Sequence, residues 1–172
     1  MPLRLSTIAL DGAGLSLLEH LPVNPLAYIR GGDGLVGWGE AVRLEAHGPN
    51  RIQDLSAQWQ ALAAAAEVDD RVKLPGSGLV AFGSIAFADS SETSSALIVP
   101  KVLLGLRDGR AWLTTVELDA QGHTVDVSGA GKFWENPTPC VTNSPVALHS
   151  GAQSASAFKT SVEKAVSAIT DD

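Results

Sequence analysis

Short runs of alternating or continuous hydrophobic residues, separated by glycine-rich and polar turns, fill the first two thirds of the chain. In the first run, Leu3 to Leu10, the side chains of Leu3, Leu5 and Thr7 alternate with polar neighbours, which is typical of a half-buried strand. Further strands are predicted over residues 26–30, 35–44, 79–87, 97–107 and 111–118. The spacing of these runs favours a sheet as the main element.

Two turns join neighbouring strands as hairpins. Gly31 to Gly34 separate the strands at 26–30 and 35–44, and glycine readily adopts the positive φ that tight hairpin turns need. Asp108-Gly109 separates the last two predicted strands and is the strongest short hairpin signal in the sequence. Hairpins connect antiparallel strands, so the sheet is predicted to be largely antiparallel.

Two amphipathic helices flank these strands. The first is predicted from Asn50, a suitable N-cap, to about Asp69, with a loop over 74–78 after it. Its apolar face comprises Ile52, Leu55, Trp59, Leu62, Ala63 and Ala66. The second begins near Ser154, and its apolar stripe comprises Phe158, Val162, Ala165, Val166 and Ile169. The predicted fold class is α+β, a largely antiparallel sheet with flanking helices; residues 88–95 and 121–145 are predicted to be loops.

Composition and charge narrow the function classes. The chain has 172 residues, 45% of them hydrophobic and 18% charged, which suits one globular domain or a substantial part of a larger one. A formal net charge of -7 disfavours a nucleic-acid partner. The single cysteine, Cys140, allows neither an intrachain disulfide nor a cysteine metal cluster.

Targeting signals are not evident in the sequence. The first residues, MPLRLSTIALDGAG, lack the basic start, long apolar core and cleavage site of a signal peptide. The longest apolar runs, such as those at 96–99 and 102–104, are too short to span a bilayer. We therefore expect a soluble, cytoplasmic protein with no membrane partner.

Residues Gly32 to Gly37 match the dinucleotide fingerprint G-x-G-x-x-G, but the context is wrong. That fingerprint works when a helix follows it, because the helix N-terminus binds the pyrophosphate. Here Trp38 and the residues after it read as a strand, so we interpret the glycines as a hairpin turn followed by an open strand face. Gly37 and Gly39 are expected to share that face and to leave room for Trp59 or Trp112.

Other residues with catalytic chemistry do not form a recognisable motif. The histidines, at positions 20, 47, 123 and 149, lack metal-ligand spacing. Glu40 and Glu45 have opposite strand parity and are expected not to face each other. Lys101 and Lys132 are candidate anion-binding residues, although a solvated or sheet-edge lysine is the favoured interpretation.

The nucleophile candidates also fit structural roles better. The serines at positions 77, 90, 91, 94 and 95 are not in a G-x-S-x-G elbow, and Cys140 has no cysteine-protease signature. The tryptophans at positions 38, 59, 112 and 134 are expected to pack in the core. The sequence therefore assigns no catalytic residue and no metal ligand, and leaves the substrate-binding residues unknown.

Three stretches in order carry a family resemblance: "LVGWGEAVR", "GLVAFGSIAFAD" and "ALIVPKVLLGLRDGRAWLTTV". Together, over about residues 26 to 170, they resemble the N-terminal half of the chorismate-utilising enzymes, and among these the isochorismate synthases of menaquinone and siderophore biosynthesis. Anthranilate, aminodeoxychorismate and salicylate synthases are related alternatives. The stretch Leu17 to His20 departs from the L-L-E-S of anthranilate synthases, which disfavours that branch.

The resemblance implies half of the two-sheet fold of anthranilate synthase component I and a Mg²⁺-dependent conversion of chorismate to isochorismate. In that family the catalytic lysine and the metal-binding glutamates lie mostly in the C-terminal half. The final stretch "SAFKTSVEKAVSAITDD" resembles the helix just before the lysine strand. We therefore expect residues 1–172 to be one N-terminal portion without the catalytic half, inactive and binding no Mg²⁺ alone.

The partners that the resemblance allows are chorismate, in the complete enzyme, and a C-terminal half carried by another chain. A non-catalytic remnant or a partner-binding module is the alternative. A half-domain would leave sheet edges and the last helix without partners. The isolated chain is accordingly expected to be marginally stable or self-associating.

Overall fold

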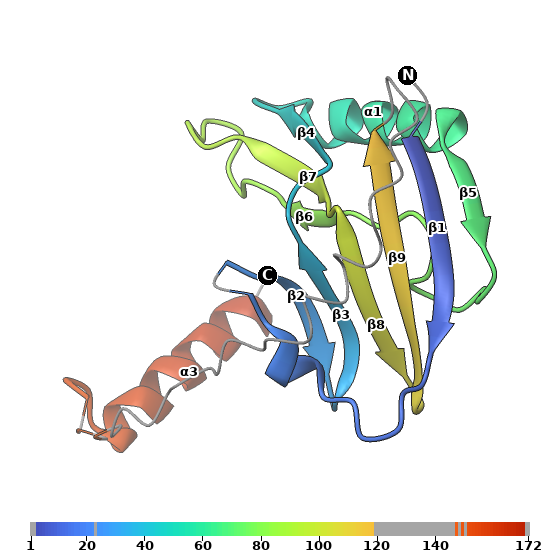
Figure 1. Ribbon diagram of the computed structural model, residues 1–172. Helices are drawn as coiled ribbons and strands as arrows, with labels where there is room; N and C mark the ends of the chain where they lie inside the picture. The colour runs from blue at the N-terminus through green and yellow to red at the C-terminus, as the bar shows by residue number, and fades with distance from the viewer. Residues whose placement is uncertain (1–2, 23, 119–146, 148, 150, 171–172) are drawn as a thin grey trace. The chain divides into compact units, whose positions relative to one another are not determined.

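The computed structural model describes residues 3–22, 24–118, 147, 149 and 151–170 (Figure 1). It comprises two compact units, residues 1–140 and 141–172. The predicted irregular stretch at 121–145, with Lys132, Trp134, His123 and Cys140, lies outside the described residues.

A six-stranded sheet forms most of the first unit, in the order β2-β3-β8-β9-β1-β5 (Figure 1). Its strands are β1 (Leu3–Leu10), β2 (Leu26–Arg30), β3 (Asp33–Trp38), β5 (Glu67–Asp70), β8 (Val102–Arg107) and β9 (Arg110–Leu118). All neighbours pair antiparallel except β1 and β5, which are parallel. The prediction of an α+β fold with a largely antiparallel sheet is confirmed.

Both predicted hairpins are present, each with two turn residues. Gly31 and Gly32, at φ +62° and +94°, connect β2 to β3. Asp108 and Gly109, at φ +49° and +72°, connect β8 to β9. Two successive residues with positive φ match the right-handed twist of the flanking strands. The glycine-rich stretch is therefore a turn that leads into strand β3, as predicted, and it opens no helix.

Two long predicted strands are wrong as single elements, because each is divided between two sheets. Residues 35–44 divide into β3 and β4 (Val42–Ala46), and residues 97–107 divide into β7 (Ser95–Val99) and β8. The second sheet has the order β4-β7-β6, where β6 is Phe82–Ser84. Such corners arise where a strand bends and changes sheet.

The two corners lie against each other. The Lys101 N–H donates to the carbonyl of Trp38 at 3.0 Å, and the Ala41 N–H donates to that of Val99 at 2.8 Å. Gly39, at φ +64°, provides the bend on one strand, and Pro100 interrupts the other. Both strands therefore pass from one sheet to the other at the same point, where backbone hydrogen bonds join them.

The expected tryptophan contact at Gly37 and Gly39 is wrong. A side chain at Gly37 would meet Pro100 and the Phe82 ring, while the Lys101 methylenes lie against Gly39. Gly39 does not share a strand face with Gly37, because β3 ends at Trp38. The absence of a side chain at Gly37 and Gly39 therefore leaves room for Pro100 and Lys101, where the other strand bends.

The first helix, α1 (Arg51–Ala65), is shorter than predicted. Asn50 is its N-cap by position, but its side chain makes no capping hydrogen bond. Leu55 is buried and Trp59 and Leu62 are partly buried against the core, whereas Ile52 is exposed. The predicted end near residue 69 is wrong because residues 67–70 instead form β5 along the free edge of β1.

The predicted buried strand at 79–87 is largely wrong. Only β6 pairs, and only with β7, while Ile85 and Phe87 are exposed. The carbonyls of Ala86 and Phe87 accept hydrogen bonds from the buried guanidinium of Arg51 at 2.8 and 2.9 Å. These backbone groups are therefore bound to a side chain and take no part in a sheet.

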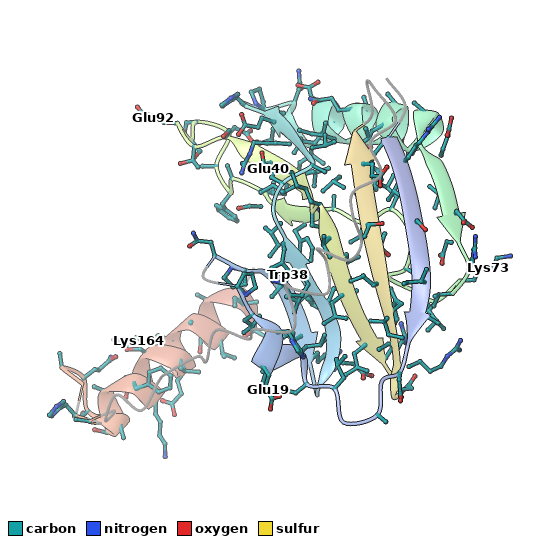
Figure 2. All side chains as sticks on the ribbon, in the orientation of Figure 1. Glu19, Trp38, Glu40, Lys73, Glu92 and Lys164 are labelled. Carbon is teal, nitrogen blue, oxygen red and sulfur yellow. The ribbon has the colours of Figure 1, made fainter. Side chains whose placement is uncertain are left out.

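Two hydrophobic clusters cover the two faces of the larger sheet. One contains Trp38, visible beside β3 in Figure 2, and is covered by the segment that includes the short 3₁₀ helix Leu17–His20. The other joins Leu3, Leu5 and Val116 to α1 and residues 79–81. Leu3, Leu5 and Thr7 are buried and their neighbours Arg4 and Ser6 are exposed, so the predicted alternation of β1 is confirmed.

In the second unit, α3 (Ala155–Thr170) confirms the second predicted helix. The Ser154 hydroxyl accepts a hydrogen bond from the Ala157 N–H at 3.2 Å, as an N-cap does. The stripe formed by Phe158, Val162, Val166 and Ile169 is exposed. Among the described helices, none is long and apolar enough to cross a membrane.

Candidate functional site

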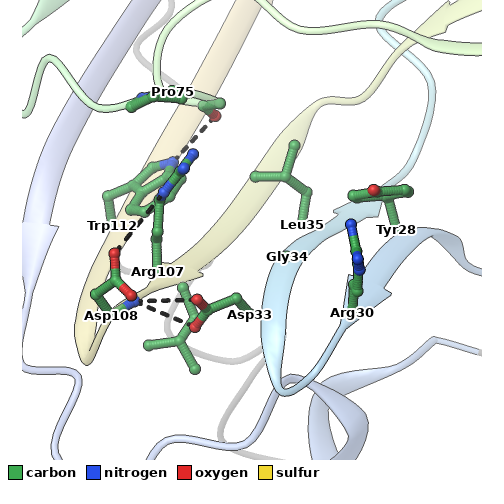
Figure 3. A pocket seen from close by; sticks show the side chains of 11 residues that line it. Tyr28, Arg30, Asp33, Gly34, Leu35, Pro75, Arg107, Asp108 and Trp112 are labelled. Carbon is green, nitrogen blue, oxygen red and sulfur yellow. Dashed lines mark hydrogen bonds and ion pairs between the residues drawn. The ribbon is translucent and has the colours of Figure 1, made fainter.

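A cavity of about 420 Å³ opens on one face of the larger sheet, beneath the loop that follows β5 (Figure 3). Its lining comes from β2, β3, β8, β9 and the loop: Tyr28, Arg30, Asp33, Gly34, Leu35, Pro75, Gly76, Leu106, Arg107, Asp108 and Trp112. A volume of this size is within the range of small-molecule sites. It is the candidate functional site.

Strand register places the apolar floor of the cavity. Tyr28 pairs with Leu35, Leu35 with Gly105, and Gly105 with Trp112, so these residues form one row across four strands. Residues paired across antiparallel strands project from the same face. Two aromatic rings thus stand at the ends of the row, with Leu35 between them.

Trp112 is held from two sides. Its ring lies over Gly105, where any side chain would overlap the indole. Its Nε1–H donates to the carbonyl of Gly76 in the loop at 3.2 Å. The buried indole therefore links the floor of the cavity to its roof.

The roof is shaped by the carboxylate of Asp70, the last residue of β5, which accepts hydrogen bonds from the loop that follows. Asp70 Oδ1 accepts hydrogen bonds from the N–H groups of Val72 and Lys73 at 2.9 and 3.1 Å, and Oδ2 accepts one from Ser77 Oγ at 2.5 Å. Burial raises the pKa of Asp70, but these hydrogen bonds outweigh it and leave the pKa lowered. The ionised carboxylate therefore stabilises the loop that carries Gly76.

Replacing Asp70 by asparagine is expected to lower the free energy of unfolding at pH 6 by about 1 kcal/mol, because the loop loses charge-assisted hydrogen bonds. The folded pKa lies below the unfolded value of about 3.8, so the contribution is present above the unfolded pKa and is lost progressively as the pH falls through the folded pKa. Urea unfolding at pH 6 and pH 3 measures both values. The difference in the free energy of unfolding between the wild type and Asp70→Asn should be smaller at pH 3 than at pH 6.

Asp69→Asn is the matched control, because Asp69 forms only an exposed ion pair with Arg71 at 2.9 Å. It should change stability little at either pH. An equal loss in both variants, or a gap for Asp70→Asn that does not change with pH, would contradict the role assigned to Asp70.

Charged side chains gather at one end of the cavity. Arg30 pairs in register with Asp33, and Arg107 follows the last paired residue of β8 beside β3, so the three lie in one row. Both Asp33 oxygens accept the Asp108 N–H at 3.2 Å. The Arg107 Nε lies 3.9 Å from Asp108 Oδ2, at the limit of an ion pair. This end of the cavity therefore carries two guanidinium groups, from Arg30 and Arg107, and two carboxylates, from Asp33 and Asp108.

The sequence predictions did not identify this cavity. Asp33, Arg107 and Asp108 lie in stretches that the sequence analysis interpreted as turns or as a family resemblance, not as a binding site. The charged residues come together only through the register of β2, β3 and β8. The signal available in the sequence was the parity of the strands around the two hairpin turns. Because Tyr28 and Arg30 alternate with Ile29, they were predictable as neighbours on one face.

Glu40 and Glu45, predicted not to face each other, share a partner in the structure. Both contact Arg43, with Glu40 Oε2 at 2.7 Å from Nη2 and Glu45 Oε1 at 3.5 Å from Nη1. Glu40 lies before the start of β4 at Val42, so strand parity does not relate its direction to that of Glu45. Hydrogen bonds from Arg43 lower the pKa of Glu40, so this carboxylate is held ionised and is poorly suited to donate a proton at neutral pH.

The other candidate residues of the described chain remain separate. His47 and His149 are exposed, and His20 Nδ1 is buried without a hydrogen-bond partner. No group of three histidine, cysteine or acidic residues close enough to hold a metal exists within residues 3–118 or 151–170 as described. Ser77 lies in a turn, as expected, and Lys101 is exposed at the sheet corner.

The tryptophan prediction is confirmed for the described residues. Trp38 and Trp112 are buried, and Trp59 packs against the second cluster. These rings therefore contribute to the core, and only Trp112 also lines the cavity.

Comparison with known proteins identifies the family. The family model described as "Chorismate binding enzyme" matches residues 27–172, which include the cavity, the sheet corner and α3. No curated protein and no solved structure gave a significant match. Because the family model spans most of the sequence and the α+β architecture agrees with it, the chain belongs to the chorismate-binding enzyme family.

Proposed function

We propose that this chain is the N-terminal portion of an isochorismate-synthase-like enzyme. The family match over residues 27–172 carries the proposal. The resemblance of "LVGWGEAVR" and "ALIVPKVLLGLRDGRAWLTTV" to isochorismate synthases supports this branch. The reaction is the transfer of hydroxyl from C4 to C2 of chorismate, in which water attacks one ring carbon as hydroxide leaves another.

In this proposal the chain provides a framework and not the reacting groups. Mg²⁺ would be held by oxygen ligands in the complete enzyme. The described residues do not fit a metal site, since they include no suitable group of three ligands. We therefore assign no step through Mg²⁺ to this chain. Its own contribution is the two-sheet scaffold, fixed by the paired corner at Gly39 and Pro100.

The exposed faces of the chain support a further partner segment. The apolar stripe of α3 is exposed, and Phe87 is fully exposed in the loop after β6. Large apolar side chains gathered on one helix face mark interaction surfaces more often than isolated ones do. We propose that a catalytic C-terminal half, on the same or another chain, covers such surfaces.

The test compares the chain alone with the chain extended by the coding sequence immediately downstream. Each protein is incubated with chorismate and Mg²⁺, and the products are separated by liquid chromatography. The extended protein should form isochorismate without ammonia and lose this activity in EDTA. The 172-residue chain alone should form none.

Products distinguish the alternatives. Anthranilate or aminodeoxychorismate formed only with added ammonia would overturn the isochorismate assignment and keep the family. Salicylate from the extended protein would point to the salicylate branch. If the extended protein binds no chorismate and forms no product, the chain is a partner-binding module or a remnant.

A further inference from the structure

We propose that the free edge of β2 pairs with the same edge of a second copy of this chain, across a two-fold axis at Tyr28. The two larger sheets then form one continuous sheet. The contact uses residues of the first unit only, and it does not depend on whether the complete enzyme forms isochorismate.

The edge of β2 is open to a further strand. Among the described residues, β2 pairs only with β3 and ends the order of the larger sheet (Figure 1). Natural sheets protect such edges with charged side chains, proline or a bulge. The pairing of β2 with β3 is continuous over all five residues, and the central residues Ala27, Tyr28 and Ile29 include no charge and no proline. The centre of β2 therefore lacks these protections.

The other edge of the same sheet has a different character. β5 carries the carboxylates of Glu67, Asp69 and Asp70 in four residues. Two copies of such a strand would place like charges opposite each other, which destabilises strand pairing. A second copy is therefore expected at β2 and not at β5.

The backbone of β2 is self-complementary. Arg30 and Asp33 flank the two-residue turn, whose hydrogen bond joins them, and hydrogen-bonded pairs alternate with non-hydrogen-bonded pairs along the strands. The backbone groups of Ala27 and Ile29 therefore point to the free side. When two β2 strands pair antiparallel about Tyr28, Ala27 of each copy lies opposite Ile29 of the other. This register pairs every free group of both residues and forms four hydrogen bonds.

Side chains on one face of β2 fit the same register. Tyr28 is 64% exposed and extends from β2 close to Arg30 (Figure 3). At the axis the two Tyr28 residues form a non-hydrogen-bonded pair, in which side chains approach most closely. Aromatic pairs across strands are favourable, and the Arg30 of the other copy is a diagonal neighbour within reach of the Tyr28 ring.

Charge complementarity also favours a second copy. Among the described residues, Arg30 forms no hydrogen bond or ion pair. The register places it opposite Leu26 of the other copy, which lines a pocket together with Glu40 and Arg43. Arg43 contacts both Glu40 and Glu45, so two carboxylates and one guanidinium leave one negative charge there. Each Arg30 therefore faces a negative region of the other copy.

The dimer is expected to be weak. Five residues of each copy make a contact smaller than standard interfaces, so the dissociation constant should be roughly 10 to 100 μM. Sedimentation equilibrium of the full chain, from about tenfold below to about tenfold above that range, measures it. A contact between identical edges closes at two copies, so no larger species should form.

Substitutions on β2 test the surface. Tyr28→Lys should weaken dimerisation roughly tenfold or more, because it places two ammonium groups opposite each other at the axis. Phe87→Lys is the matched control, since it makes the same kind of change at a fully exposed aromatic residue outside β2 and should leave the dimer unchanged. Arg30→Glu should also weaken the dimer, and Glu40→Lys added to it should restore part of the affinity. Far-UV circular dichroism verifies that each variant is folded.

Disulfide cross-linking tests the register, in a Cys140→Ser background. Tyr28→Cys should form an intermolecular disulfide with oxidised glutathione, because directly opposite Cβ atoms lie about 4.5 to 5.5 Å apart. Arg30→Cys should not cross-link with itself, because its opposite residue in the other copy is Leu26. A mixture of Arg30→Cys and Leu26→Cys should cross-link.

Each outcome decides the proposal. A monomer at every concentration overturns it, and so does a dimer that Tyr28→Lys leaves intact or that Phe87→Lys weakens equally. Larger open assemblies would indicate head-to-tail contact between unlike edges and would overturn the two-fold arrangement. Cross-linking of Tyr28→Cys but not of Arg30→Cys alone supports the register, and the opposite preference refutes it. The isochorismate assay is independent of all these results.

Discussion

Replacing Gly105 by alanine is expected to lower the free energy of unfolding by about 3 kcal/mol. A Cβ at this position would overlap the Cε2 and Cζ2 atoms of the Trp112 ring. The ring cannot move away easily, because it is 1% exposed and its Nε1–H is bonded to the Gly76 carbonyl at 3.2 Å. Urea unfolding of both proteins, followed by far-UV circular dichroism, measures the difference.

Gly83→Ala is the matched control, because it makes the same change in a strand, where the added Cβ would lie 3.1 Å from the flexible end of Leu97. It should cost much less. A double-mutant cycle with Trp112→Leu tests the cause, since alanine at position 105 should cost at least about 1 kcal/mol less once the indole is gone. Equal costs in both backgrounds would show that Trp112 is not the obstacle.

Replacing Arg51 by methionine is expected to destabilise the chain by about 3 kcal/mol, because it removes the four hydrogen bonds that the buried guanidinium donates. Arg51 is 6% exposed, and its guanidinium donates to three carbonyls and to the Asp89 carboxylate at distances of 2.5 to 2.9 Å. These bonds join the start of α1 to the loop after β6. The variant should unfold at lower urea concentration, and its 85–89 segment should become accessible to protease in the native state.

Arg43→Met is the control for losing an arginine that is paired with carboxylates. Arg43 contacts Glu40 and Glu45, but its side chain is 41% exposed, so its removal should cost less than about 1 kcal/mol. Arg51→Lys should not restore stability, because an ammonium group cannot reach four acceptors with the geometry of the guanidinium fork. If lysine restores it fully, or if both arginines cost the same, the role given to the buried fork is wrong.

The hairpins and the helices could be predicted because their signals are local. Two residues with positive φ form each turn, and the sequences Gly31-Gly32 and Asp108-Gly109 adopt that geometry at low cost. The last helix needs only its spacing of apolar residues and a serine cap. In each case the residues that determine the element are neighbours in the sequence.

The predictions are wrong where a segment distant in the sequence determines the local structure. Residues 67–70 follow a helical pattern, but the free edge of β1 offers backbone hydrogen bonds that a longer helix would leave unused. Residues 85–87 look like a buried strand, but the carbonyls of Ala86 and Phe87 accept hydrogen bonds from Arg51. The long predicted strands continue through Gly39 and Pro100 in sequence, and only their mutual contact reveals the corner.

The candidate site also combines features with a local cause and features that depend on distant segments. Its arginines could be placed on one strand face from parity, but not opposite a particular neighbour, because register across β2, β3 and β8 depends on strands remote in sequence. The roof of the cavity could not be predicted from the hydrophobic pattern. In the sequence the segment 74–78 shows only that it is a glycine-rich loop, whereas its shape depends on hydrogen bonds to the Asp70 carboxylate.

The sequence by itself determined the α+β class, the two hairpins, the last helix and the family, because turn chemistry, periodicity and ordered motifs are properties of contiguous residues. The tertiary structure alone decided how the long strands divide between two sheets, which carbonyls Arg51 takes, and that Arg30 and Arg107 border one cavity. Those features depend on contacts between segments far apart in the chain, where the competition for backbone hydrogen bonds and for space is resolved.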